Sequence, residues 1–73
     1  MGKLEAKSDV SGSVWKIEVA LGQKVAEGDT LVLIESMKME IPIIAEQAGT
    51  VASILVAEGD AITERQSVVT LET

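Results

Sequence analysis

The sequence predicts a small all-β domain made of two copies of one β-unit. Val, Ile and Leu dominate its apolar residues, and β-branched side chains pack well on pleated sheets. Short segments of alternating apolar and polar residues are separated by turn motifs at a spacing that leaves no room for a helix of ordinary length. A shift of 37 positions aligns residues 11–36 with residues 48–73 without a gap. Such internal similarity indicates a repeated structural unit.

The two copies share residues at positions that matter for a β-fold. Identical pairs include Gly12/Gly49, Val14/Val51, Ile17/Ile54, Val19/Val56, Ala20/Ala57, Gly22/Gly59, Glu27/Glu64 and Glu35/Glu72. Other pairs within the expected strands keep an apolar residue on both sides, as Leu31 and Val68 do, and Ile34 and Leu71. We therefore treat residues 1–73 as one domain with an internal repeat.

Each unit is expected to contain two strands joined by turns. The first strand alternates apolar residues up to a glycine, at Gly22 or Gly59, where a turn with positive φ costs little. A short apolar contact and a polar turn follow, and the second strand covers Thr30–Glu35 or Ser67–Glu72. Because neither unit can bury its apolar face alone, we expect the two to face each other about a pseudo-two-fold axis in a flattened sandwich or barrel.

The segment between the copies is expected to form a β-hairpin. Thr30–Ser36 must reverse into Met39–Ala45 near Met37-Lys38, and two-residue hairpin turns of type I′ favour Asn and Gly. Met-Lys is a poor choice for such a turn, and a departure from local turn chemistry points to a functional constraint. Pro42 lacks a backbone donor, so the outgoing strand should pair on one side only there or contain a bulge.

Composition excludes several classes of function. The chain has no cysteine and no histidine, which removes a thiolate nucleophile, the commonest general base and the commonest zinc ligand. Its net charge is −6, its six cations are scattered, and Trp15 is its only aromatic residue, so we expect no nucleic-acid partner. No apolar run could cross a membrane or act as a signal peptide, so we expect a cytoplasmic protein without a membrane partner. Asp29 and Asp60 are expected to cap turns, and no metal site is expected.

Lys38 is the candidate functional residue. Taken alone, it would be one more solvated lysine, with Met37 and Met39 filling gaps at the edge of the core. The repeat and the unusual turn favour a different interpretation, in which the apex of a rigid hairpin presents a projecting primary amine. Such an amine suits acylation by a partner enzyme, because the unprotonated form attacks an activated acyl group.

The segment Glu35-Ser36-Met37-Lys38-Met39-Glu40 resembles the biotin attachment hairpin of biotinyl/lipoyl domains, whose hallmark is Met-Lys-Met. The resemblance extends over essentially the whole chain and is strong for small free-standing biotin/lipoyl attachment proteins. It implies two four-stranded antiparallel sheets in a barrel-sandwich hybrid, with biotin joined to Lys38 through an amide. In residues 35–40, Lys38 would then be the attachment residue, and Met37 and Met39 on either side of it would be the flank that the ligase recognises. Glu35, Ser36 and Glu40 would form the rest of the attachment hairpin.

The family also has members with a protruding thumb in the first half of the domain. Here the interval from Gly12 to Gly22 equals the interval from Gly49 to Gly59, so no thumb insertion is expected.

The resemblance implies a carrier and not an enzyme. A biotin protein ligase would modify Lys38, and the domain, expected to be a monomer, would move carboxybiotin between a biotin carboxylase and a carboxyltransferase. Lipoate attached by a lipoyl ligase, for a 2-oxo acid dehydrogenase system, is the first alternative, and modification by both groups stays open. The second alternative is an unmodified interaction module like the barrel-sandwich hybrid of membrane-fusion adaptors, which needs no hairpin lysine.

Overall fold

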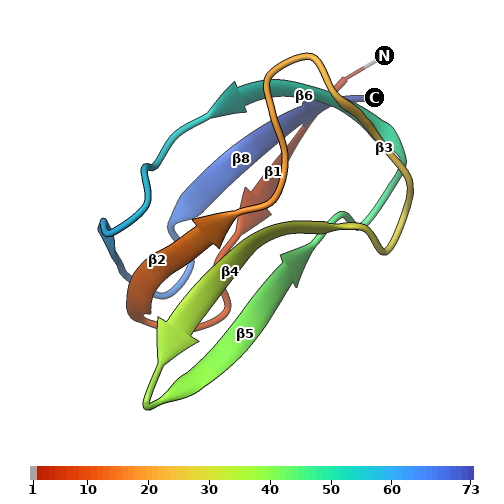
Figure 1. The fold of residues 1–73 in the computed structure, drawn as a ribbon. Helices are drawn as coiled ribbons and strands as arrows, with labels where there is room; N and C mark the ends of the chain where they lie inside the picture. The colour runs from red at the N-terminus through yellow and green to blue at the C-terminus, as the bar shows by residue number, and fades with distance from the viewer. Residues whose placement is uncertain (1) are drawn as a thin grey trace.

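The computed structural model describes residues 2–73, which form eight β-strands and no helix (Figure 1). The strands are β1 (Lys3–Lys7), β2 (Gly12–Ile17), β3 (Lys24–Val25), β4 (Thr30–Ser36), β5 (Met39–Ile44), β6 (Gly49–Ile54), β7 (Ala61–Ile62) and β8 (Ser67–Glu72). The all-β prediction is confirmed. Within the described chain there is accordingly no helix that could span a membrane.

The strands make two four-stranded antiparallel sheets with the orders β1-β8-β6-β3 and β5-β4-β2-β7. A shift of 37 residues converts one order into the other, strand by strand. The registers also correspond, since Leu4 pairs with Leu71 in one sheet and Ile41 pairs with Ile34 in the other. This correspondence confirms the pseudo-two-fold arrangement. The repeat boundaries at 11–36 and 48–73 remain predictions, because strand pairing does not define where a repeat begins.

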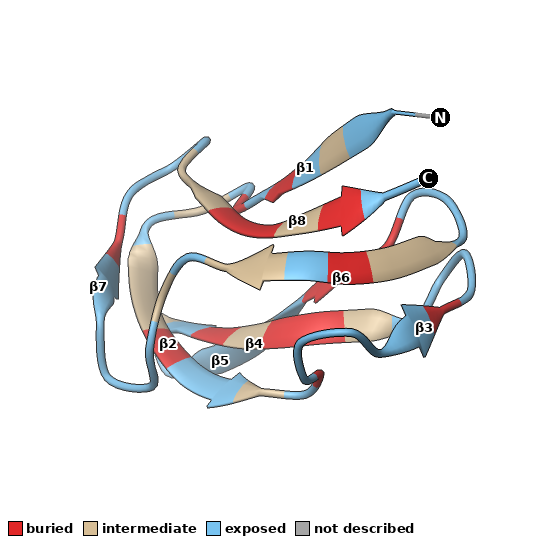
Figure 2. Ribbon diagram, turned by 90° about the horizontal axis from the view of Figure 1, so that it is seen from above, coloured by how far each residue is buried: buried red, intermediate tan, exposed pale blue. Residues whose placement is uncertain are grey.

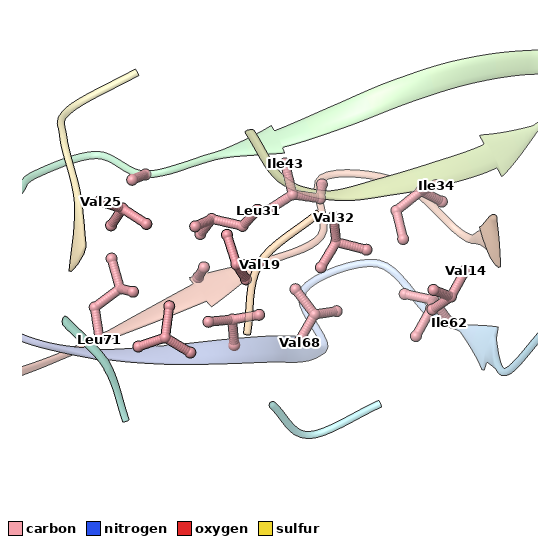
Figure 3. Packing of buried hydrophobic residues seen from close by; sticks show 14 residues of the cluster. Val14, Val19, Val25, Leu31, Val32, Ile34, Ile43, Ile62, Val68 and Leu71 are labelled. Carbon is pink, nitrogen blue, oxygen red and sulfur yellow. The ribbon is translucent and has the colours of Figure 1, made fainter. Parts of the chain in front are cut away.

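The two sheets enclose one aliphatic core (Figures 2 and 3). Its fully buried side chains come from both halves of the chain, as Leu31 and Ile34 on β4 and Leu71 on β8 illustrate. Burying a side chain of this size stabilises the fold by about 1.5–3 kcal/mol. The core residues are Ala6, Val14, Val19, Val25, Leu31, Val32, Ile34, Ile43, Ala45, Val51, Ile62, Val68, Val69 and Leu71.

The turns between strands are held by side chains of the expected kind. The carboxylate of Asp29 accepts a hydrogen bond of 2.9 Å from the backbone N–H of Ala26, and Asp60 does the same for Ala57. These bonds close the turns locally and confirm the predicted role of both aspartates. Pro42 lies on β5, an edge strand that pairs with β4 alone, as its missing N–H requires.

The first strand was not expected from the sequence. In β1, charged residues alternate with Leu4 and Ala6, and only the latter two face the core. The strand completes its sheet by pairing with β8 at the end of the chain. Gly2 and Thr73 exchange two backbone hydrogen bonds of 3.1 and 2.9 Å, so the described ends lie side by side, at the opposite end of the molecule from the β4–β5 hairpin (Figure 1).

Arg65 is expected to lower the stability of the fold. Its φ is 73°, whereas the equivalent position in the first half holds Gly28 at φ 90°. Side chains with a Cβ are strained in this region, so Arg65→Gly should raise the free energy of unfolding by about 0.5–1 kcal/mol, and Gly28→Ala should lower it by about 1 kcal/mol. Urea denaturation of the two variants measures both changes. A loss of stability in Arg65→Gly would contradict this explanation.

Candidate functional site

The hairpin between β4 and β5 turns at Met37 and Lys38. Both residues have positive φ, 52° and 67°, and they are flanked by the paired residues Ser36 and Met39. Positive φ at both central positions is the signature of a type I′ turn. The predicted two-residue reversal is therefore confirmed, and it is built from residues that are strained in it by about 1–2 kcal/mol each.

The side chains at the turn stand in solvent. Met37 is 93% exposed and Met39 is 65% exposed, so the interpretation that these methionines fill gaps at the core edge is wrong. Lys38 is exposed as well. Within residues 2–73 the ion pairs are Lys7–Glu5 and Lys16–Glu18, and Lys38 has no carboxylate within 4.0 Å. Its amine is accordingly open to approach from outside.

Two glutamates flank the turn on neighbouring strands. Glu35 on β4 and Glu40 on β5 are directly opposite partners in the ladder, and both are exposed. The preceding residue Ile34 is fully buried, so the strand is anchored in the core immediately below the glutamates. The predicted hairpin residues 35–40 are thus brought together at one end of the molecule, on a base that the core holds in place.

Ser11 ties the hairpin to the rest of this end of the molecule. The Ser36 hydroxyl donates a hydrogen bond of 2.8 Å to the backbone carbonyl of Ser11, and the Ser11 hydroxyl accepts one of 3.0 Å from the backbone N–H of Glu64. Ser11 was not identified from the sequence. A signal was present, because its equivalent in the second half is Ala48, which has no hydroxyl.

Gly12 allows β2 to lie close to the base of the hairpin. A Cβ at this position would stand 2.3 Å from the backbone oxygen of Glu35. The equivalent Gly49 has the same constraint, with 2.7 Å to the oxygen of Glu72. Since both halves require the glycine, this pair serves the fold and not the chemistry of Lys38.

Comparison with known proteins identifies the family. Residues 5–71 match the model of the biotin/lipoyl family, described as "Biotin-requiring enzyme". The chain belongs to the biotin/lipoyl family. It is 43% identical over 58 residues to the biotinylated protein TB7.3 homolog of Mycobacterium leprae, covering 80% of this chain and 82% of that protein. It is 40% identical over 55 residues to the biotin/lipoyl attachment protein of Bacillus subtilis, covering 75% of each.

A solved structure shares the fold of this biotin/lipoyl domain. The urea carboxylase of Kluyveromyces lactis superposes with a TM-score of 0.94 at 30% identity, over 99% of this chain and 6% of that much longer one. Together with the family match, these relatives identify the domain as a biotin carrier, non-catalytic in itself, with biotin favoured over lipoate. The residues at the hairpin are suited to hold biotin. Amide formation needs a projecting lysine with free access, and Lys38 is exposed and has no ion-pair partner within the described residues.

The strain at the turn gives a test of its geometry. Replacing Met37 with Asn and Lys38 with Gly supplies the residues that a type I′ turn favours, so the free energy of unfolding should rise by about 1–2 kcal/mol. Lys38→Arg, which keeps a side chain with the same backbone preference, serves as the control and should leave stability unchanged. Urea denaturation distinguishes the two variants. A stability equal to wild type in the Asn-Gly variant would show that the turn is not of this type.

Proposed function

We propose that Lys38 is the residue to which a biotin protein ligase joins biotin, so that residues 1–73 act as one carrier domain. The observation that carries this proposal is the position of Lys38 at the apex of a strained two-residue turn, exposed and without an ion-pair partner. In the reaction, the amide bond forms between Nζ and the carboxyl carbon of biotin. The bond from that carbon to its activating phosphate breaks, and the amine loses a proton.

The fold supports this role by fixing the position of the backbone from which the Lys38 side chain projects. The backbone on both sides of the turn is paired in the β4–β5 ladder, and the carbonyl of Ser11, the residue before β2, accepts a hydrogen bond from Ser36. Biotin, once attached, supplies a carrier for a carboxyl group. A tethered carrier meets each active site at a high effective concentration that the length and stiffness of its connections set.

The two methionines would form the surface next to the reacting amine. Met37 and Met39 present flexible, polarizable side chains that adapt to an apolar surface, and neither adds a charge that would compete with the amine. Neither side chain belongs to the core, so packing does not require methionine at these positions. Contact with the ligase explains why methionine occupies both positions.

The partners proposed for the loaded carrier are a biotin carboxylase and a carboxyltransferase. Support comes from relatives that are themselves named as carboxylases, such as the biotin-dependent acyl-coenzyme A carboxylase subunit of Mycobacterium leprae, of which this chain covers 9%. We place the modification in the cytoplasm, where ATP for the ligase is available, and expect the domain to be a monomer.

Ligase treatment tests the attachment site directly. Incubation with biotin protein ligase, biotin and ATP should add one biotinyl group per chain to wild type and none to Lys38→Arg, as measured by intact mass. The arginine variant keeps the positive charge and the exposed side chain while removing the primary amine, so it isolates the acylation step. Labelling of Lys38→Arg would move the site to another lysine. An unlabelled wild type would contradict the proposal as a whole.

The methionine flank has its own test. Met37→Ala and Met39→Ala should each lower kcat/KM for biotinylation by about tenfold, because each removes an apolar side chain that the ligase would cover. Stability should stay close to wild type, since both side chains are exposed. Initial rates of biotin incorporation measure the effect. Rates equal to wild type in both variants would remove the methionines from the recognition surface.

Lipoate is the second candidate group, because the related protein of Bacillus subtilis is named for both attachments. A parallel incubation with lipoate and a lipoyl ligase separates the cases. Rapid biotinylation with slow or absent lipoylation supports the biotin carrier, and the reverse would contradict it.

A further inference from the structure

The outer face of the lysine-bearing sheet β5-β4-β2-β7 is unusually apolar. Leu33 and Ile44 lie between buried neighbours along their strands, so strand alternation directs them away from the core, and Pro42 lies on the same side because it pairs with Leu33. The bulge in β2 places both Trp15 and Lys16 opposite Leu33, which in turn pairs with Pro42. We call this surface the apolar face and define it by Trp15, Leu33, Pro42 and Ile44.

The apolar face is accessible over most of its width. Trp15 and Ile44 are each 47% exposed and Pro42 is also exposed. At the β5 edge the face continues into a groove against β1, where Lys7 and Glu46 join Pro42 and Ile44 in the lining. Contiguous exposed apolar residues with a polar border are typical of interaction sites.

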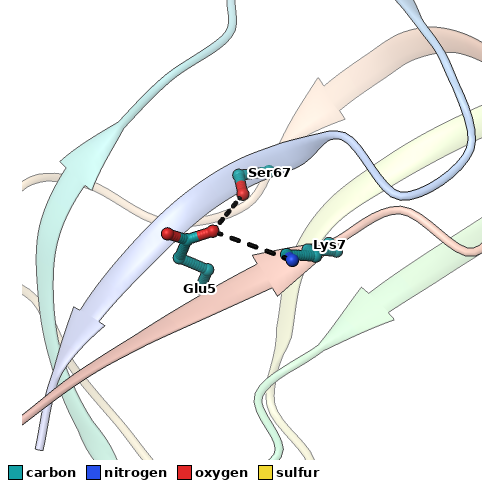
Figure 4. A network of polar contacts seen from close by, with 3 residues as sticks. All are labelled: Glu5, Lys7 and Ser67. Carbon is teal, nitrogen blue, oxygen red and sulfur yellow. Dashed lines mark hydrogen bonds and ion pairs between the residues drawn. The ribbon is translucent and has the colours of Figure 1, made fainter.

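The other sheet provides an internal control for what the fold requires. Under the 37-residue shift, the four positions of the apolar face correspond to Ala52, Thr70, Glu5 and Lys7. In that sheet the outer face is bound together by polar contacts (Figure 4). Ser67 donates a hydrogen bond of 2.7 Å to Glu5, which lies 4.0 Å from the amine of Lys7. Since the same backbone positions accept these residues, the fold does not need the apolar ones.

The charged residues beside the apolar face also differ from their equivalents in the other sheet. Glu35 and Glu40 are opposite partners in the lysine-bearing sheet, whereas their equivalents in the other sheet are Glu72 and Lys3, an opposite-charge pair. Like charges directly across a ladder are unfavourable. The carboxylate pair between Lys38 and the apolar face is therefore suited to a cation supplied from outside.

A protein that acts on Lys38 has the size to cover this face. A standard interface buries about 800 Å² on each partner, which corresponds to a disc of about 16 Å radius. Pro42 is four residues from Lys38 along β5, a separation of about 13 Å at the usual strand rise. Contact with the hairpin and contact with the apolar face thus fit within one interface.

We propose that the apolar face is the docking surface for the biotin protein ligase, which meets it with apolar side chains and directs a Lys or Arg at the Glu35–Glu40 pair. This inference rests on the proposed modification of Lys38. It adds a recognition surface beyond the hairpin itself, with Trp15 as its largest contact. Tryptophan at the centre of an interface commonly contributes much of the binding energy.

The internal control also supplies the test variant. Trp15→Ala, Leu33→Thr, Pro42→Glu and Ile44→Lys together give the apolar face the residues of the other sheet, and the net charge stays at −6 because one acid and one base are added. The matched control, Lys3→Gln with Glu5→Gln, changes the other outer face away from the groove and also keeps the net charge. Circular dichroism checks that each variant folds, and ligase kinetics then give KM and kcat.

The fourfold variant should have a kcat/KM at least tenfold lower than wild type, through a higher KM with kcat nearly unchanged. The kcat/KM of the control should stay within twofold of wild type. A decrease smaller than tenfold in the fourfold variant would overturn the docking proposal, and normal labelling of wild type would still support attachment at Lys38. Failure of wild type to be labelled at all is the separate failure of the proposed function. Sedimentation of wild type as a dimer that the exchange dissociates would assign the face to a second copy and also overturn the proposal.

The glutamate pair gives a second test that does not depend on folding of the fourfold variant. Glu35→Gln with Glu40→Gln removes the like-charge contact, so thermal stability should stay equal or rise, yet kcat/KM should fall at least fivefold at low salt. The salt dependence of the rate should also become shallower, since screening acts on the charges that were removed. An unchanged rate and an unchanged salt dependence would contradict a cation at this position of the ligase.

Discussion

Burial of aliphatic side chains between the two sheets is the interaction on which the remaining structure depends. At 73 residues the chain has a small core, and neither half could cover its apolar face without the other. The core anchors β4 through Leu31, Val32 and Ile34, immediately before the strand enters the hairpin. Because the base of the hairpin cannot move without disturbing the core, the strained turn at Met37 and Lys38 is held in a conformation that its residues would not favour alone.

The pseudo-two-fold symmetry separates what the fold needs from what it does not. Gly12 and Gly49 recur because a Cβ at either position would approach a neighbouring backbone oxygen. Asp29 and Asp60 cap turns, although these two residues are not aligned by the shift, since the aligned partner of Asp29 is Gln66. Where equivalent positions in the two halves hold different residues, the fold does not require a particular one. The hydroxyl of Ser11 and the indole of Trp15 have no counterpart in the second half, and both belong to the lysine-bearing side.

Much of this arrangement was predictable from the sequence because it depends on local patterns. The 37-residue shift predicted two matching units, and the segment between them had to reverse at Met37-Lys38, as it does. The strand β1 was missed because its charged residues Lys3, Glu5 and Lys7 outnumber the two apolar ones that face the core. The short strands β3 and β7 have two residues each, too few to show a period. The Ser11 contacts join segments 25 and 53 residues apart, which no local pattern encodes. The apolar face was also missed, because its members come from three strands and their shared side appears only once the register is known.

A rigid backbone beneath a mobile lysine side chain is the central physical claim, and it can be measured in solution without any partner. Backbone ¹⁵N relaxation of the unmodified chain gives order parameters for residues 36–39. If the core and the Ser11 contacts hold the hairpin, these order parameters should lie near 0.85, about the value of rigid backbone, while the Lys38 side chain moves freely. Values below about 0.6 at Met37 and Lys38 would show a flexible loop and contradict the claim.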